Sequence, residues 1–160
     1  MNSVFNKEAV KRVEKSIKEF DPKLKITFLE QTARTAQDAA TAIGCNEGAI
    51  VKSLLLKVSE SFVLCLISGD QRCSLNKLKK FLNKKDVSMA HPEEVKEITG
   101  YTIGGVSPVG HLIKIKIYID NNLKRFTTVY AAAGHPNCIF KIEFDQLTIL
   151  TSGEIVDIAE

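Results

Sequence analysis

One lysine stands in an apolar segment of the sequence, where an ammonium group is costly to bury. Lys52 interrupts the apolar run Ile50–Leu56. The two-residue period of a strand puts it on the same face as Ile50 and Leu54. Burial lowers the pKa of a lysine and leaves the ammonium in need of a carbonyl, carboxylate or phosphate partner. Lys52 is therefore a candidate functional residue. The alternative is that it lies at a strand end and extends to water.

Two glycine-containing segments are candidates for binding a ligand through the main chain. Residues 104–110 read Gly-Gly-Val-Ser-Pro-Val-Gly, which predicts a loop whose amides can hold a carbonyl or phosphate oxygen. Residues 131–136 read Ala-Ala-Ala-Gly-His-Pro, which leaves room for a ligand beside His135. The alternatives are a tight connector for the first segment and a structural or exposed histidine for the second.

Positive charge is concentrated in one short segment, although the net charge of the chain is only +3. Five lysines there have no acidic residue between them, and we predict a helix whose apolar stripe includes Leu75 and Leu78. They form either a solvated helix face or a surface that contacts nucleic-acid phosphates. The five are Lys77, Lys79, Lys80, Lys84 and Lys85.

Common catalytic and metal-binding motifs are absent from the sequence. There is no Gly-x-Ser-x-Gly, P-loop, Gly-x-Gly-x-x-Gly or His-Glu-x-x-His motif, which argues against the enzyme classes that carry them. The four cysteines form no Cys-x-x-Cys pair and the three histidines are far apart, so we expect no metal and no cofactor. Ser68, Ser107 and the cysteines have no base nearby in sequence, so no covalent nucleophile is assigned.

Length and composition fit one globular domain over residues 1–160, with 44% hydrophobic and 26% charged residues. The apolar runs are far shorter than the roughly 20 residues that span a bilayer. The amino-terminal residues carry no apolar signal segment. We therefore expect a cytoplasmic protein with no membrane partner.

Helical periodicity and end signals predict four helices that would position these residues. They lie between Asn6 and Asp21, between Thr35 and Gly44, after Ser74, and from Pro92 to Ile98.

Apolar and alternating runs predict at least six strands. The fold class is therefore α+β, a single domain with a mixed, curved, barrel-like sheet of about six to seven strands flanked by helices. The run Leu112–Ile119 is expected to be half-buried, with its isoleucines on one face. The predicted strands are Ile26–Phe28, Ile50–Val58, Phe62–Ser68, Leu112–Ile119, Val129–Ala133, Cys138–Glu143 and Ile155–Ala159.

Seven segments form an ordered set over nearly the whole chain: Arg34–Ala36, Ile50–Leu54, Ser68–Asp70, Thr99–Tyr101, Gly104–Gly110, Ile119–Asp120 and Tyr130–Pro136. In this order they resemble the YbaK/prolyl-tRNA synthetase-associated editing domain family, whose members hydrolyse mischarged aminoacyl-tRNA. The resemblance implies a pocket for the aminoacyl-adenosine end of tRNA and ester cleavage without a metal. Either a positioned water or, in cysteine-specific members, the thiol of the substrate attacks the carbonyl.

The resemblance also implies roles for individual residues. Lys52 matches the functional lysine of the family, and Gly104 and Pro108 match its GxxxP loop. Gly134 and His135 match the glycine-histidine turn of some alanine-editing relatives, although the residues that follow differ from their motif. Further substrate-binding positions implied by the resemblance are Thr35, Ser68, Gly69, Gly105 and Ser107.

The expected function is therefore a trans-editing deacylase that acts on Cys- or Ala-tRNA(Pro). Its expected partners are aminoacyl-tRNA, whose acceptor end enters the pocket and whose phosphates the five lysines contact, and prolyl-tRNA synthetase, since some relatives need a synthetase partner. Two alternatives remain open, a noncatalytic tRNA- or synthetase-binding module of the same fold and a hydrolase of small esters or amides. A small apolar pocket does not by itself choose among alanine, serine and cysteine.

Overall fold

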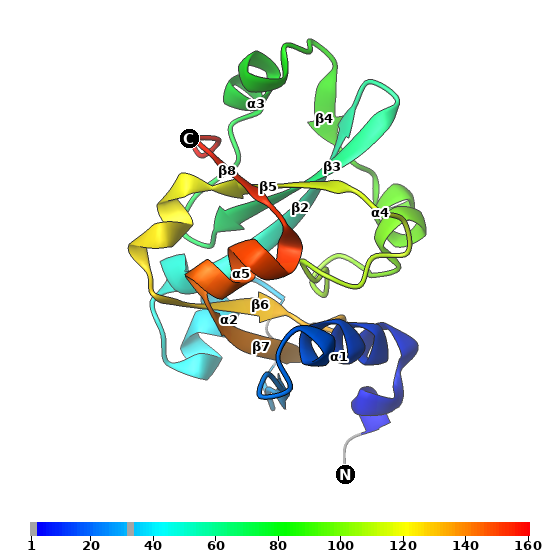
Figure 1. The fold of residues 1–160 in the computed structure, drawn as a ribbon, viewed down its shortest axis with the longest axis vertical. Coiled ribbons are helices and arrows are strands. Elements are labelled where there is room, and N and C mark those ends of the chain that lie inside the picture. Colours follow the sequence, from blue (N-terminus) through cyan, green and yellow to red (C-terminus); the bar gives the residue numbers. More distant parts are fainter. Residues whose placement is uncertain (1–2, 32–33) are drawn as a thin grey trace.

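Strands from the whole length of the chain form one sheet in the computed structural model, which describes residues 3–31 and 34–160 (Figure 1). The strand order is β1-β7-β6-β2-β3-β5-β8, with β4 paired to β2. β2 is antiparallel to β3 but parallel to β6, which confirms the expected mixed sheet. The strands are β1 (Ile26–Phe28), β2 (Ile50–Val58), β3 (Ser61–Ser68), β4 (Val87–Met89), β5 (Lys116–Asp120), β6 (Thr128–Ala132), β7 (Cys138–Glu143) and β8 (Glu154–Val156).

Helices surround this sheet, and together they confirm the α+β class. The described residues include the α-helices α1 (Glu8–Phe20), α2 (Ala36–Ile43), α3 (Leu75–Leu82), α4 (Pro92–Thr99) and α5 (Phe144–Thr151), and 3-10 turns at Ser3–Asn6, Glu47–Ala49 and Asn121–Arg125. Along the long axis of the molecule, α1 and α3 lie at opposite ends (Figure 1). None of the described helices is long and apolar enough to cross a bilayer.

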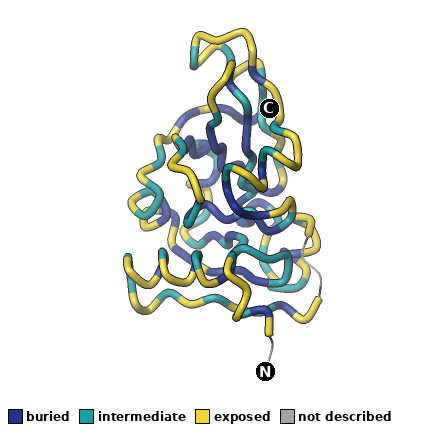
Figure 2. Tube along the Cα trace, turned by 90° about the vertical axis from the view of Figure 1, so that its right-hand side faces the viewer, coloured by how far each residue is buried: buried dark blue, intermediate teal, exposed yellow. Residues whose placement is uncertain are grey.

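The central strand β3 is buried on both faces, which explains its nearly continuous apolar sequence. Leu64 and Leu66 pack into the largest apolar cluster, which also takes in the buried face of α1. Cys65 and Ile67 point the other way, into a second cluster beneath α3. Figure 2 shows this buried interior in dark blue, with exposed segments at its periphery.

Strand β2 changes its partner along one edge, and this change creates the opening that holds the candidate site. Its first two residues pair with β6, and its last three pair with β4. No described strand pairs with residues 52–55 on that edge, where the Leu55 carbonyl accepts a hydrogen bond from the Ala90 amide (3.1 Å). The sheet is therefore interrupted in the middle of β2.

The predicted strand Leu112–Ile119 is wrong in its first half, because β5 begins only at Lys116. The amides of Leu112 and Ile113 donate to carbonyls at the end of α4 (3.3 and 3.1 Å) instead of joining a ladder. The two residues are 56% and 48% exposed. The half-buried pattern is also wrong for Tyr118, which is buried because Phe81 of α3 covers it at a ring distance of 5.5 Å.

Other element ends differ from the prediction for local reasons. Lys7, not Asn6, precedes α1, and its side chain makes no capping bond. The predicted strand Ile155–Ala159 is wrong in its second half: β8 ends at Val156, and the amides of Ile158 and Ala159 donate to the Asp120 carboxylate (2.9 and 3.0 Å). The prediction omits α5 and β4.

Candidate active site

A cavity of about 530 Å³ opens at the interruption beside β2. Its walls come from the start of α2, from β2 itself, from the end of β6, and from the loop after α4. Volumes of this order are typical of sites for small organic groups. Four residues expected to bind substrate or act on it line this cavity: Thr35, Lys52, Gly69 and Gly104.

Lys52 is a partly buried cation in the cavity wall. Its Nζ donates to the main-chain carbonyl of Gln71, which belongs to the turn after β3. Burial lowers the pKa of the Lys52 ammonium, and the negative charges of Glu47 and Asp70 oppose that shift. Lys52 is therefore partly buried and has a main-chain partner, which fits the first of the two interpretations of the sequence and not simple extension to water.

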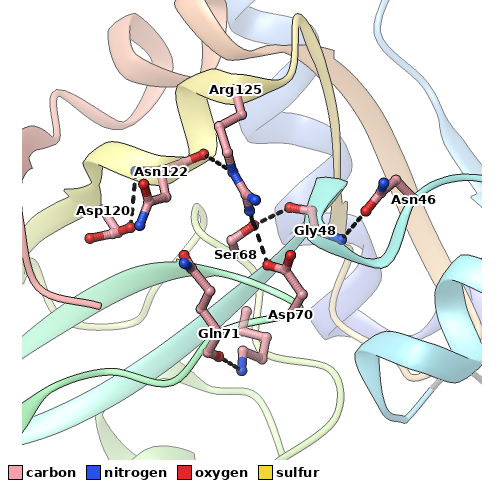
Figure 3. Close-up of polar contacts among 9 residues, drawn as sticks. Asn46, Gly48, Ser68, Asp70, Gln71, Asp120, Asn122 and Arg125 are labelled. Carbon is pink, nitrogen blue, oxygen red and sulfur yellow. Dashed lines mark hydrogen bonds and ion pairs between the residues drawn. The ribbon is translucent and has the colours of Figure 1, made fainter. Parts of the chain in front are cut away.

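The turn that supplies this carbonyl is held by a polar network (Figure 3). The buried Ser68 hydroxyl donates to the Gly48 carbonyl and accepts from Arg125 Nη2 (2.9 Å). The same Arg125 nitrogen pairs with Asp70 Oδ1 at 3.0 Å. Partial burial raises the pKa of the Asp70 carboxyl, but the hydrogen bond and charge of Arg125 outweigh it, so that pKa lies below its ordinary value. Ser68 thus positions the turn and does not line the cavity.

Gly69 occupies a position that admits no side chain. A Cβ there would lie 2.4 Å from the Glu47 carbonyl oxygen and 2.8 Å from the Cβ of Ala36. The start of α2 therefore packs directly against the turn after β3. Thr35 caps this helix by accepting a hydrogen bond from the Asp38 amide (3.0 Å), as predicted.

The loop 104–110 contributes to the cavity only through its first half. Gly104 and Val106 line it, whereas Ser107 and Pro108 are buried and do not. The carbonyl of Ser107 accepts a hydrogen bond from His111 Nε2 (2.7 Å). The resemblance placed Gly104 and Pro108 together as ligand-binding positions, and the structure brings only Gly104 to the cavity wall.

The second glycine segment packs against the first. The Gly134 amide donates to the Gly105 carbonyl (3.1 Å), and a Cβ on Gly134, whose φ is +88°, would lie 2.8 Å from the main chain of Ala9. His135 is half-buried, and its Nδ1 accepts from the Asn137 amide (3.1 Å). Burial and nearby cations lower the pKa of His135, and the ring does not line the cavity.

Sequence reasoning missed two residues that fasten the loop 104–110. Arg12 of α1 donates to the carbonyls of Gly100 and Gly110 (both 3.1 Å). The hydroxyl of Tyr101 donates to the Val109 carbonyl (2.6 Å). Tyr101 lies in one of the resembling segments, but nothing local in the sequence marks Arg12, because its partners are about 90 residues away.

The five lysines do not act as one helical face. Lys77 is held by Asp157 (3.1 Å) and by the Ala159 carbonyl (2.7 Å). The Asn83 cap, with a left-handed φ of 55°, ends α3, so Lys84 and Lys85 lie beyond the helix. An open depression gathers the remaining lysines: Lys79, Lys80, Lys84 and Lys85.

The site has the parts needed to bind an acyl group and its oxygens. A cation and main-chain groups line one side of the cavity, and apolar side chains of the largest cluster line another. The described residues contain no group of three His, Cys, Asp or Glu side chains able to hold a metal. Such a site can position an ester and stabilise negative charge on its carbonyl oxygen.

Known proteins that are similar to this chain include tRNA-editing domains. Residues 30–150 match the profile of the aminoacyl-tRNA editing domain. A solved structure described as a candidate trans-editing enzyme for prolyl tRNA synthetase is 35% identical, with a TM-score of 0.90 over 96% of this chain and 98% of that one. The protein YwhH of Bacillus subtilis is 33% identical over 77% of this chain and 78% of its own length.

Two further relatives carry names that refer to tRNA. EbsC of Enterococcus faecalis, named as a candidate Cys-tRNA(Pro)/Cys-tRNA(Cys) deacylase, is 27% identical over 78% of this chain and 76% of its own. The proline–tRNA ligase of Caldicellulosiruptor bescii is 32% identical over 65% of this chain, but the match spans only 18% of the ligase.

Proposed function

The chain belongs to the aminoacyl-tRNA editing domain family, and from this premise we propose that it is a trans-editing deacylase that hydrolyses the ester bond of mischarged tRNA, with Cys- or Ala-tRNA(Pro) as substrate. The observation that carries the proposal is the partly buried Lys52 in the wall of a cavity large enough for an aminoacyl end. We further propose that the editing domain covers all of residues 1–160 and acts in the cytoplasm.

The proposed reaction needs no covalent enzyme intermediate. Water, or the thiol of a cysteinyl substrate, attacks the ester carbonyl, and the bond to the ribose oxygen then breaks, with a proton passing to that oxygen. Lys52 interacts with a phosphate or ester oxygen and stabilises the developing negative charge. Main-chain groups of Gly69 and Gly104 orient the ester and the terminal ribose. We assign Thr35, Gly105 and His135 to the surroundings of this acceptor end.

Macromolecular contacts are the second part of the proposal. Lys79, Lys80, Lys84 and Lys85 contact tRNA phosphates, a role that does not depend on sequence. Lys77 is omitted because its ammonium is already paired with Asp157. Prolyl-tRNA synthetase is the proposed protein partner.

A deacylation panel tests the proposal against a noncatalytic module. Cysteinyl-, alanyl- and seryl-tRNA, on tRNA(Pro) and on their cognate tRNAs, are incubated with the parent chain and with Lys52→Ala. We expect turnover by the parent and loss of most of it in the variant, with tRNA binding retained. Binding without turnover by the parent would support the noncatalytic module, and turnover of small esters alone would support a general hydrolase.

A further inference from the structure

Ser53 lines the cavity next to Lys52 but points to the opposite face of β2. Its face is shared by Val51 and Leu55, which belong to the largest apolar cluster and also line the cavity. Two more members of that cluster, Val95 and Ala131, line it as well. The cavity is therefore lined by residues from both faces of β2, and Ser53 belongs to its apolar part.

The Ser53 hydroxyl has no hydrogen-bond partner among the described residues, and its oxygen is buried. The other buried side-chain oxygen in this situation, Oε1 of Gln71, lies in the turn that binds Lys52. Leaving a buried hydroxyl unpaired is unfavourable, so its presence calls for a partner that the free chain does not supply. A serine oxygen is placed by one rotatable bond, and the residue itself lines the cavity, so the cavity is where such a partner can bind.

The main chain of Ser53 also pairs with no other described strand on the outer edge of β2. The Leu55 carbonyl points to that edge, where it meets the Ala90 amide. Main-chain groups of a strand alternate in direction, so the N–H and C=O of Ser53, two residues earlier, point to the same edge. That edge has no described strand opposite residue 53, because β6 pairing ends at Val51 and β4 pairing begins at Leu56.

From these two observations we propose that Ser53 determines which aminoacyl group is accepted, favouring side chains that carry a hydroxyl or a thiol over alanine. The Ser53 hydroxyl forms a hydrogen bond with that side chain, and its unpaired main chain binds the aminoacyl backbone. An alanyl group fits the same space but leaves the Ser53 hydroxyl unpaired. Sites that hydrogen-bond a substrate group discriminate more strongly than purely apolar ones. This inference rests on the proposed deacylase function.

The test compares Ser53→Ala with the parent on seryl-, cysteinyl- and alanyl-tRNA(Pro). Ser53→Thr, which keeps the hydroxyl, and Ser61→Ala, an exposed serine elsewhere, serve as matched controls. We expect kcat/KM of Ser53→Ala to fall about five- to tenfold for the seryl or the cysteinyl ester, the loss of one neutral hydrogen bond, and to stay unchanged for the alanyl ester. The ester that shows the loss identifies hydroxyl or thiol as the selected group. An equal change for all three esters would overturn the proposal.

Binding of stable analogues separates this inference from the proposed function. Seryl, cysteinyl and alanyl amides of 3′-amino-3′-deoxyadenosine are titrated into the parent protein and into Ser53→Ala, and binding is measured by calorimetry. If the parent hydrolyses no ester, the proposed deacylase function fails. The role of Ser53 would still be supported if the parent bound the seryl or cysteinyl amide more tightly than the alanyl amide and Ser53→Ala lost this difference. Equal affinity of the parent for all three amides would contradict it.

Discussion

At the scale of single residues, Lys52 brings a positive charge into an apolar strand and holds it on one main-chain carbonyl. From the sequence, a lysine in an apolar strand is a candidate for a partnered ammonium, with extension to water as the alternative. Its partner, the Gln71 carbonyl, could not be predicted, because a turn 19 residues away supplies it. The hydroxyl of Ser53 gives no signal, since a serine in a strand is unremarkable until its surroundings are known.

The lowered pKa of Lys52 leads to a prediction about pH. Burial lowers that pKa, so the ammonium loses its proton at a lower pH than an ordinary lysine. If its charge stabilises the transition state, the saturated deacylation rate should fall on the alkaline side, below the usual range for lysine titration. The measurement is single-turnover deacylation from about pH 7 to about pH 10.5, corrected for uncatalysed ester hydrolysis.

The matched control for this experiment is Lys52→Arg, because a guanidinium stays charged over the whole range. Its rate is expected to be lower, owing to the larger group, but free of the alkaline decline. A decline of the same shape in both proteins would assign it to another group and contradict the role of the Lys52 charge.

At the scale of elements, local signals are reliable where one segment decides its own structure. The Thr35 cap and the Gly44 stop of α2 are both present. The same signals fail where a distant segment competes, as at Leu112 and Ile113, whose amides bind the end of α4. The sequence of α5 is rich in apolar and β-branched residues over a short length, so periodicity does not distinguish it from a strand.

The loop 104–110 is expected to depend on Tyr101 for its stability. Burial raises the pKa of Tyr101 to about 12, so its hydroxyl remains a donor to the Val109 carbonyl at neutral pH. Tyr101→Phe should lower the free energy of unfolding by about 1–3 kcal/mol, because the buried Val109 carbonyl loses this donor. The change is measured as a shift of the urea midpoint at constant m-value. The control is Tyr118→Phe, because the Tyr118 hydroxyl makes no hydrogen bond in the described structure. An equal loss of stability in both variants would contradict the role of Tyr101.

The lysine depression beyond α3 yields a prediction about salt. Lys80→Glu combined with Lys84→Glu should weaken tRNA binding and flatten the slope of log affinity against log salt by about 0.7–0.9 for each phosphate that is no longer neutralised. The saturated single-turnover rate should not change, because the cavity is built from other elements.

The control is the double variant Lys11→Glu with Lys15→Glu, on exposed positions of α1, which makes the same change of charge at the other end of the molecule. An identical slope change in both double variants would show a general charge effect and not a tRNA surface.

At the scale of the whole molecule, the α+β class and most strands were predictable, but the position of the cavity was not. The cavity exists because β2 exchanges one neighbour for another along a single edge. Those neighbours, β4 and β6, begin about 40 and 80 residues after β2 begins, and strand pairing over such distances leaves no periodic trace in a sequence. Of the positions that the resemblance to an editing family implied, Thr35, Lys52, Gly69 and Gly104 line this cavity.

The small extent of the lysine surface leads to a prediction about the proposed synthetase partner. Four lysines offer few phosphate contacts, so the electrostatic part of tRNA binding is small and leaves the affinity low at physiological salt. A synthetase that holds the same tRNA would raise the local concentration of its acceptor end. Adding prolyl-tRNA synthetase at about 0.15 M salt should therefore lower KM for mischarged tRNA(Pro) by about tenfold or more. The value of kcat should stay constant, because the cavity is already complete.

Alanyl-tRNA synthetase, which does not hold tRNA(Pro), is the control for this experiment. A rise in kcat with unchanged KM would mean that the partner completes the active site, and no effect on either constant would mean that the chain captures tRNA alone.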